Sequence, residues 1–124
     1  VAFQAYQKNK WGEKFYLFPK NPTRDFVYIN DVVEANLYAW NKYDELSGKW
    51  YDVGTGESRP FEDVLNIMEI PFEYHDEEKI PEKYQFLTKA NPDNVMPGWT
   101  PKFNLEDGTT QYKALLRVTT FSPC

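Results

Sequence analysis

The sequence has a single cysteine and a single histidine, and this scarcity removes several kinds of chemistry. Cys124 has no second thiol to pair with, so a disulfide framework is excluded and a reducing compartment is expected. His75 stands in a charged stretch with no Cys or His nearby, which argues against a metal site and a nucleophilic triad. No apolar run is long enough to span a membrane and no signal peptide is visible, so we expect a cytoplasmic protein with no membrane partner.

Glycine and positive charge are also in short supply. The net charge is −5 and the pI is about 4.9, a balance that disfavours a nucleic-acid partner. Gly54-Thr55-Gly56 follows a predicted strand, but no third glycine or lysine follows at the spacing of a phosphate loop. We therefore expect a structural turn there. One or two placed arginines could still hold a diphosphate.

Large rings are abundant instead, at 18% of the 124 residues. They predict a modest core, or a pocket, built from aromatic side chains. The length suits one domain. We expect the folded part to cover residues 1–116 and an irregular tail to cover residues 117–124, because the helical pattern decays after Leu116.

Short strands alternating with helices predict the α/β class. We expect strands at residues 15–18, 26–29, 50–53 and 72–74, and helices at residues 1–9, 31–42, 60–68 and from residue 105 onward. Capping boxes are predicted for two of the helices, Asp31 with Glu34 and Asn104 with Asp107.

Arg24 is the sharpest candidate for binding. An arginine that enters a strand beside a turn-rich loop can aim its planar fork at a diphosphate. From the residues alone, a surface arginine paired with Asp25 or with a helix carboxylate is the simpler interpretation.

Three segments carry a family resemblance: RDFVYINDVVEANLYAW at residues 24–40, the glycine turn after residues 50–53, and YQFLTKAN at residues 84–91. Together they resemble the C-terminal, substrate-binding part of the extended short-chain dehydrogenase/reductase family of nucleotide-sugar enzymes. The nearest resemblance is to the ADP-glyceromanno-heptose 6-epimerases. The expected fold is then part of a Rossmann-type α/β enzyme whose glycine-rich half is missing.

The resemblance implies roles for four residues. Arg24 matches a substrate-binding arginine, and Tyr84 matches a substrate-binding tyrosine. Phe18 and Lys20 fall in a loop that contacts substrate in the family, although here the loop is shorter and holds two prolines. The partner implied is a nucleotide sugar of the ADP-heptose type. Asn91 replaces an aspartate that looks like a helix cap, and asparagine caps equally well.

Two catalytic elements of such enzymes are missing from the sequence. Enzymes of this family bind NAD(P), which is NADP in the heptose epimerases, through a glycine-rich Rossmann turn, and they catalyse with a Tyr-x-x-x-Lys pair. Tyr16 and Lys20 have the spacing, but Pro19 lies between them and prevents the helical pair. The resemblance therefore implies a fragment that holds substrate, with no catalytic residue and no tightly bound cofactor of its own.

Other assignments stay open at this point. Related epimerases, dehydratases and reductases share the RDFVYI type of segment, and a non-catalytic binding module is a different class. Val33, Leu37 and Trp40 form an apolar stripe at helical spacing. Without a Rossmann half to cover it, we expect exposed apolar surface and a homo-oligomer.

Overall fold

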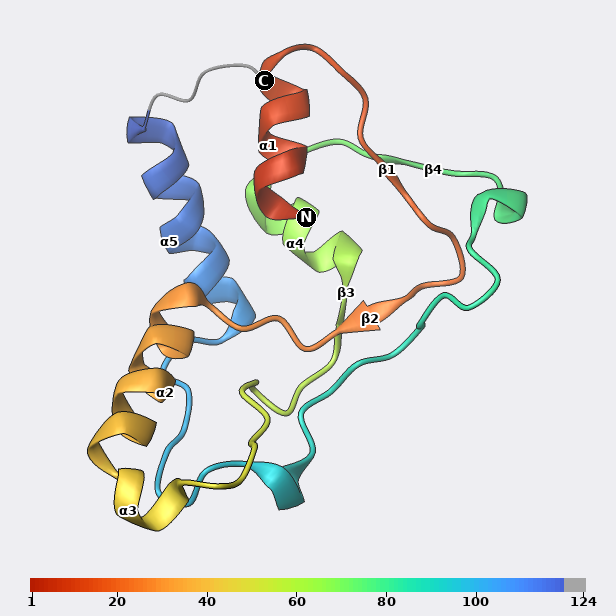
Figure 1. Cartoon of the computed structure of the whole chain (residues 1–124). Helices are drawn as coiled ribbons and strands as arrows, with labels where there is room; N and C mark the ends of the chain where they lie inside the picture. The colour runs from red at the N-terminus through yellow and green to blue at the C-terminus, as the bar shows by residue number, and fades with distance from the viewer. Residues whose placement is uncertain (120–124) are drawn as a thin grey trace.

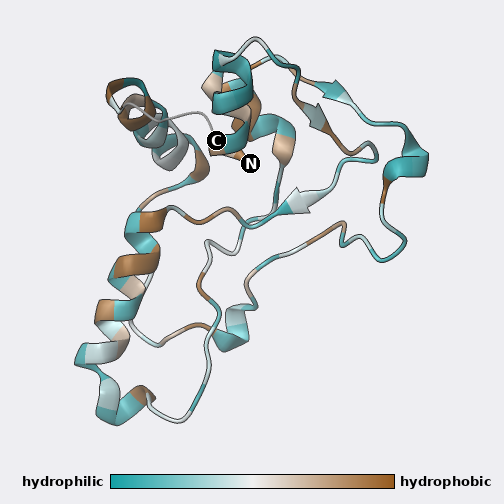
Figure 2. Cartoon of the chain, turned by 45° about the horizontal axis from the view of Figure 1, so that its top comes forward, coloured by the Kyte–Doolittle hydropathy of each residue, from teal (hydrophilic) through white to brown (hydrophobic). Residues whose placement is uncertain are grey.

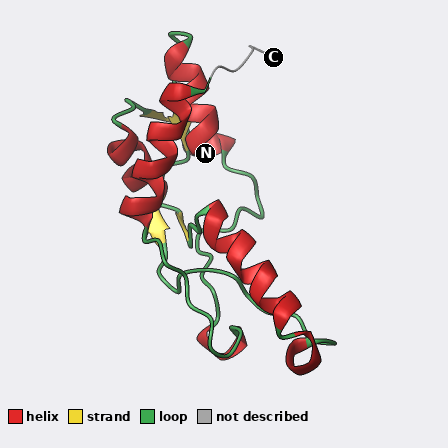
Figure 3. Ribbon diagram, turned by 90° about the vertical axis from the view of Figure 1, so that its left-hand side faces the viewer, coloured by secondary structure: helices red, strands yellow, loops and turns green. Residues whose placement is uncertain are grey.

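The structure is a computed structural model that describes residues 1–119 (Figure 1). Helices and very short strands alternate along the chain, so the predicted mixed α/β class is confirmed (Figure 3). The helices are α1 (Ala2–Lys10), α2 (Ile29–Asn41), α3 (Tyr43–Leu46), α4 (Phe61–Met68) and α5 (Leu105–Val118). The strands are β1 (Tyr16–Leu17), β2 (Thr23–Arg24), β3 (Arg59–Pro60) and β4 (Glu73–Tyr74). The 3₁₀ turns are η1 (Glu77–Lys79) and η2 (Pro92–Asn94).

The strands make two separate pairs rather than one sheet. β1 runs parallel to β4, and β2 runs antiparallel to β3. In the second pair Arg24 lies opposite Arg59, and Thr23 lies opposite Pro60. Because each strand has two residues, most of the backbone between the helices is irregular (Figure 1).

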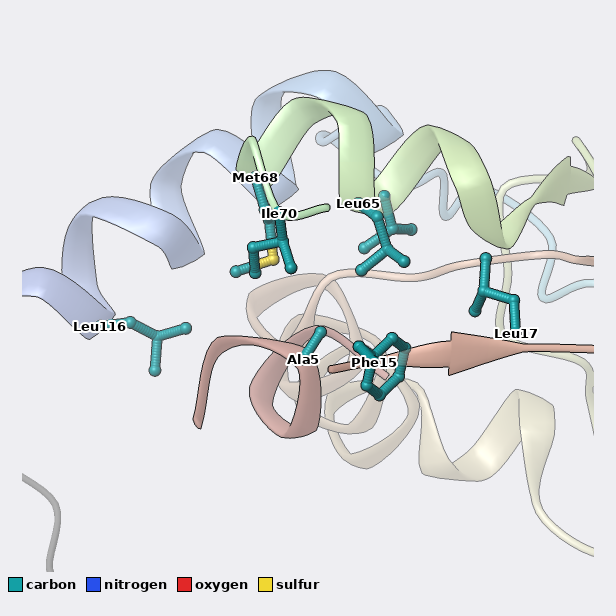
Figure 4. Close-up of a cluster of buried hydrophobic side chains, with 8 residues drawn as sticks. Ala5, Phe15, Leu17, Leu65, Met68, Ile70 and Leu116 are labelled. Atoms are coloured by element: carbon teal, nitrogen blue, oxygen red, sulfur yellow. The ribbon is translucent and has the colours of Figure 1, made fainter. Parts of the chain in front are cut away.

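The larger core lies where α1, α4, α5 and β1 meet (Figure 4). Leu65 and Leu116 are fully buried there, and Ala5 lets α1 approach α4 closely. The Tyr6 hydroxyl donates to the Leu116 carbonyl at 3.2 Å, which ties the first helix to the last. A second, smaller cluster joins α2 and α3 to the segment before α5 through Ala35, Leu46 and Met96. Leu17 buries one face of β1 in the larger core, whereas the residues of β2 and β3 are half-buried.

The start of α2 differs from the prediction in two ways. Residues 26–28 have no strand partner, so the strand expected at 26–29 is wrong, and the helix begins at Ile29. The capping box is wrong as well, because Asp31 lies inside the first turn and α2 has no side-chain cap. The Asp31 carboxylate is 1% exposed and accepts the backbone N–H groups of Lys102 and Phe103. Asp31 thus accepts from backbone groups about 70 residues away instead of from the Glu34 N–H of its own helix.

Two other predicted elements also changed. Residues 50–53 form no strand; the Asp52 N–H donates to the Asn94 carbonyl instead of to a sheet neighbour. The last helix runs to Val118, two residues beyond the expected end of the folded part. Its predicted cap at Asn104 is confirmed, since the Asn104 side chain accepts the Asp107 N–H at 2.7 Å. Residues 120–124 of the predicted tail lie outside the described residues.

The outer face of α2 carries the predicted apolar stripe, and it is exposed. Val33, Leu37 and Trp40 are 50%, 54% and 78% exposed, and Ile29 extends the stripe to the start of the helix. Figure 2 shows the hydrophobic bands on this helix. The exposed apolar surface expected from the sequence is therefore present. In the described part of the chain, no helix combines the length and apolar character needed to cross a bilayer.

Candidate functional site

The candidate site forms around β2, which is hydrogen-bonded on both of its edges. β3 lies on one side, and residues 86–88 lie on the other (Figure 1). The Thr23 N–H donates to the Phe86 carbonyl at 2.8 Å, and the Thr88 N–H donates to the Thr23 carbonyl at 3.3 Å. These bonds place residues 86–88 beside the strand that carries Arg24.

Arg24 lies between two aromatic rings. Its guanidinium carbon is 5.4 Å from the ring centroid of Phe61 and 5.2 Å from that of Tyr84. Its Nη1 donates to the Thr23 carbonyl at 2.8 Å. Within residues 1–119 Arg24 has no ion pair with a carboxylate, so the simpler interpretation, a pair with Asp25 or a helix carboxylate, is not what the structure shows. Cation–π contacts of this kind stabilise by about 0.5–2 kcal/mol each.

Arg59, which lies opposite Arg24 on β3, has its charge neutralised by three carboxylates. It pairs with Glu57 at 3.5 Å, Asp63 at 2.8 Å and Glu106 at 2.5 Å. The hydrogen bonds that Arg59 donates to Glu106 and Asp63 raise the pKa of Arg59 above its usual range. Arg59 is therefore a structural cation, whereas the charge of Arg24 is met by rings and one carbonyl.

A chain of aromatic contacts continues from Tyr84. Phe18 meets the Tyr84 ring edge-on at 4.9 Å, and His75 lies 5.3 Å from Phe18 and 5.2 Å from Tyr16, stacked on the latter. The structure thus brings together three of the four predicted residues, Arg24, Tyr84 and Phe18. His75 belongs to the same group but was considered in the sequence only as a metal ligand or catalytic base.

Lys20, the fourth predicted residue, has a different partner. Its Nζ lies 3.3 Å from Glu77 Oε2, with both side chains more than half exposed. A surface pair of this kind contributes little to stability. Lys20 also has a φ of 70°, a left-handed conformation imposed by the tight turn between β1 and β2. The structure gives no contact between Lys20 and the ring group among the described residues.

Asp25 accepts four hydrogen bonds beside the site, a role that no pattern in the sequence predicted. Its Oδ1 accepts the Thr55 N–H at 2.8 Å and the Thr55 hydroxyl at 2.6 Å. Its Oδ2 accepts the Gly56 N–H at 2.8 Å and the Ala90 N–H at 3.0 Å. Burial opposes ionisation, but these hydrogen bonds outweigh it and leave the pKa of Asp25 below its usual value. The sequence offered one signal for this role: the N–H groups of the Gly54-Thr55-Gly56 turn need an acceptor, and Asp25 supplies it.

The glycine turn is closed by this carboxylate. The Thr55 and Gly56 N–H groups, which a phosphate loop would offer to an anion, already donate to Asp25. A Cβ on Gly54 would lie 2.7 Å from Asp25 Oδ2 and 2.9 Å from the Ala90 Cβ, so Gly54 is needed for the close approach. The turn does not fit a dinucleotide phosphate, and its structural role is as predicted.

Two hollows border the region, and neither is lined by the Arg24 group. One, of about 390 Å³, lies between residues 26–29, α4 and α5 and is mainly apolar. The other, of about 310 Å³, lies beside Arg59 and Lys102. The Arg24, Phe61 and Tyr84 side chains are each half-buried. In the described part of the chain, no three His, Cys, Asp or Glu side chains are grouped to hold a metal ion.

Residues 2–54 match a known protein family, the NAD dependent epimerase/dehydratase family. The matched segment includes Phe18, Lys20 and Arg24 and ends at Gly54. Tyr84 and residues 84–91 lie outside it. The match supports the resemblance at the level of the extended dehydrogenase/reductase superfamily, and thus a nicotinamide cofactor in full-length members. It does not distinguish one nucleotide sugar from another.

Proposed function

We propose that this chain is the substrate-binding part of a nucleotide-sugar epimerase, with Arg24 as the residue that binds the diphosphate. The observation that carries this proposal is the setting of the Arg24 side chain: a cation held between the rings of Phe61 and Tyr84, with no carboxylate neutralising it in the described chain. Such a cation keeps its attraction for an incoming anion.

The geometry of Arg24 suits a planar, bidentate ligand. The contacts with the two rings restrict the movement of the guanidinium, and a restricted fork loses less conformational entropy on binding. One N–H is used by the Thr23 carbonyl, which leaves the other donors for phosphate oxygens. A diphosphate offers paired oxygens at matching spacing.

Tyr84 and Phe18 supply the neighbouring surface. Tyr84 meets Phe18 edge-on, so its phenol lies at the boundary between the charged and the aromatic part of the group. The sugar or base end of a nucleotide sugar would contact these rings, with the Tyr84 hydroxyl able to donate to a phosphate or a sugar hydroxyl. Lys20 contributes only if its pair with Glu77 opens.

At a finer level, we propose an ADP-glyceromanno-heptose 6-epimerase-like parent, because YQFLTKAN at residues 84–91 resembles that group. The parent enzyme would use NADP to oxidise and re-reduce a sugar carbon. The glycine turn does not fit the phosphates of that cofactor, since its Thr55 and Gly56 N–H groups already donate to Asp25, and we assign the described residues no catalytic step. Another nucleotide-sugar epimerase or dehydratase, or a non-catalytic binding module, is the alternative.

Calorimetric titration tests the proposal directly. We expect ADP and inorganic pyrophosphate to bind the wild-type chain, AMP to bind more weakly, and Arg24→Ala to abolish the difference between ADP and AMP. Arg117→Ala, which removes a cation from the last turn of α5, is the matched control and should bind like wild type. Equal affinity of Arg24→Ala and wild type for ADP would refute the role of Arg24. A preference for UDP-glucose over ADP-heptose would redirect the substrate assignment within the superfamily.

A further inference from the structure

Neighbouring residues Arg24 and Asp25 contact two different groups of partners. Arg24 contacts the rings of Phe61 and Tyr84, while Asp25 accepts hydrogen bonds from the glycine turn and from Ala90. The two side chains form no ion pair with each other among the described contacts. Both nevertheless reach the same segment, residues 84–90, Arg24 at its beginning and Asp25 at its end.

That segment is anchored to β2 at alternate residues. The carbonyl of Phe86 and the N–H of Thr88 bond to Thr23, and the N–H of Ala90 bonds to Asp25. The Ser58 hydroxyl strengthens the middle anchor by donating to the Thr88 carbonyl at 3.0 Å. Of these anchors, the Asp25 bond alone has a charged acceptor, and charge-assisted hydrogen bonds are about twice as strong as neutral ones.

We propose that Asp25 is a positioning residue: its carboxylate locks the glycine turn and residues 84–90 onto β2 and so holds the Tyr84 ring against Arg24. The ligand part of this inference rests on the proposed diphosphate site. The coupling between Asp25 and the Arg24–Tyr84 contact does not, because it concerns the chain without a ligand.

A carboxylate suits this position better than an amide. Each oxygen of Asp25 accepts two donors, Oδ1 from Thr55 and Oδ2 from Gly56 and Ala90. In Asp25→Asn one of these atoms becomes an NH₂ group. At Oδ2 it would face two backbone N–H donors and both hydrogen bonds would be lost; at Oδ1 the bond from the Thr55 N–H would be lost, while the Thr55 hydroxyl could turn and accept. Because the substitution keeps the size of the side chain, any effect that it has reports the loss of the negative charge and of an acceptor atom.

The experiment is NMR on the unliganded chain, comparing wild type with Asp25→Asn. We expect the Ala90 amide to lose exchange protection and the Arg24 side-chain protons to lose their ring-current shift from Tyr84. The Lys113 side chain, paired with Glu69 at 2.7 Å and remote from the glycine turn, serves as an internal control whose shifts should not change. Unchanged Ala90 exchange and Arg24 shifts in Asp25→Asn would overturn the proposal.

A second variant covers the case in which Asp25→Asn fails to fold. Thr55→Val removes one donor to Asp25 with little change in shape and should shift the same signals in the same direction, by a smaller amount. If Thr55→Val folds and leaves the Ala90 and Arg24 signals unchanged, the proposal is equally refuted.

Pyrophosphate binding then separates positioning from general damage. We expect Asp25→Asn to weaken binding about tenfold in the wild-type background, the effect of losing about 1.4 kcal/mol, and to weaken it no further when Tyr84→Leu is already present. A purely structural defect would weaken both backgrounds equally. If wild type binds no pyrophosphate, the proposed function fails, while the NMR comparison still decides the coupling.

Discussion

The carboxylate of Asp31 accepts the backbone N–H of Lys102 at 2.9 Å, across 71 positions of sequence. It accepts the Phe103 N–H at 3.0 Å with its other oxygen, and it is almost fully buried. The first turn of α2 is thereby fixed to the segment that leads into α5. An acidic residue with the sequence signature of a local helix cap instead joins two distant parts of the chain.

Asp31→Ala should be strongly destabilising. It removes the acceptor of two backbone N–H groups, and we expect the free energy of unfolding to fall by about 2–4 kcal/mol. Urea denaturation followed by fluorescence measures this. Glu34→Ala is the matched control: it would be damaging if the predicted capping box existed, and is expected to change stability by less than about 0.5 kcal/mol. Comparable losses in the two variants would contradict the observed geometry.

The stability of the chain should depend on the ionisation of Asp25. The hydrogen bonds lower its native-state pKa despite burial, so the native state binds fewer protons than the unfolded state as pH falls. The stabilisation is complete above about pH 4 and is lost as the pH falls through the native pKa.

Denaturation of wild type and Asp25→Asn between pH 3 and 7, as a rough working range, tests this dependence. Asp25→Asn should show the shallower loss of stability toward low pH. Part of the acid sensitivity should remain in the variant, because the Lys113 and Arg59 side chains also lower the pKa values of Glu69 and Glu106. Parallel pH profiles of the two proteins would show that Asp25 does not contribute.

Arg24→Lys should reduce diphosphate affinity although it keeps the charge. Lysine has no planar group to lie between Phe61 and Tyr84 and no bidentate fork. We expect about tenfold weaker binding of ADP, measured by titration calorimetry. Arg117→Lys on α5 should have no effect. If Arg24→Lys binds as wild type does, a positive point charge is sufficient and the ring contacts are incidental.

The exposed stripe on α2 should mediate self-association, and we propose that it does. Leu37→Glu places a charge in the middle of the stripe and is expected to reduce the sedimentation coefficient toward that of a monomer. Leu115→Glu on α5 is the matched control, because Leu37 and Leu115 are both 54% exposed. A wild-type chain that sediments as a monomer at high concentration, or two variants that behave alike, would contradict the proposal.

Periodicity in the sequence was sufficient for the elements that build the main core. The spacing of Phe61, Val64, Leu65 and Met68 predicted α4 within one residue, and all of these side chains pack in the larger cluster. The expected strands at residues 15–18 and 72–74 contain β1 and β4. By contrast, residues 26–29 alternate like a strand but have no partner backbone in the described chain, and alternation alone cannot supply one.

The site could be predicted only in part, for a related reason. Arg24, Tyr84 and Phe18 were singled out by resemblance, and no local pattern shows that residues 18, 24 and 84 meet in space. Asp25 escaped notice because its donors lie 30 and 65 residues away. Side chains that bond to distant backbone leave no periodic trace, so local reasoning assigns them to a neighbour.

The bond between the Tyr6 hydroxyl and the Leu116 carbonyl spans 110 positions, and it has a consequence for the order of folding. α1 cannot complete its packing until α5 is available. During synthesis this requires almost the entire described chain to have left the ribosome. Loop closure over such a separation is slow compared with helix formation. The part of the α1 surface that faces α5 should therefore be among the last to become protected during folding.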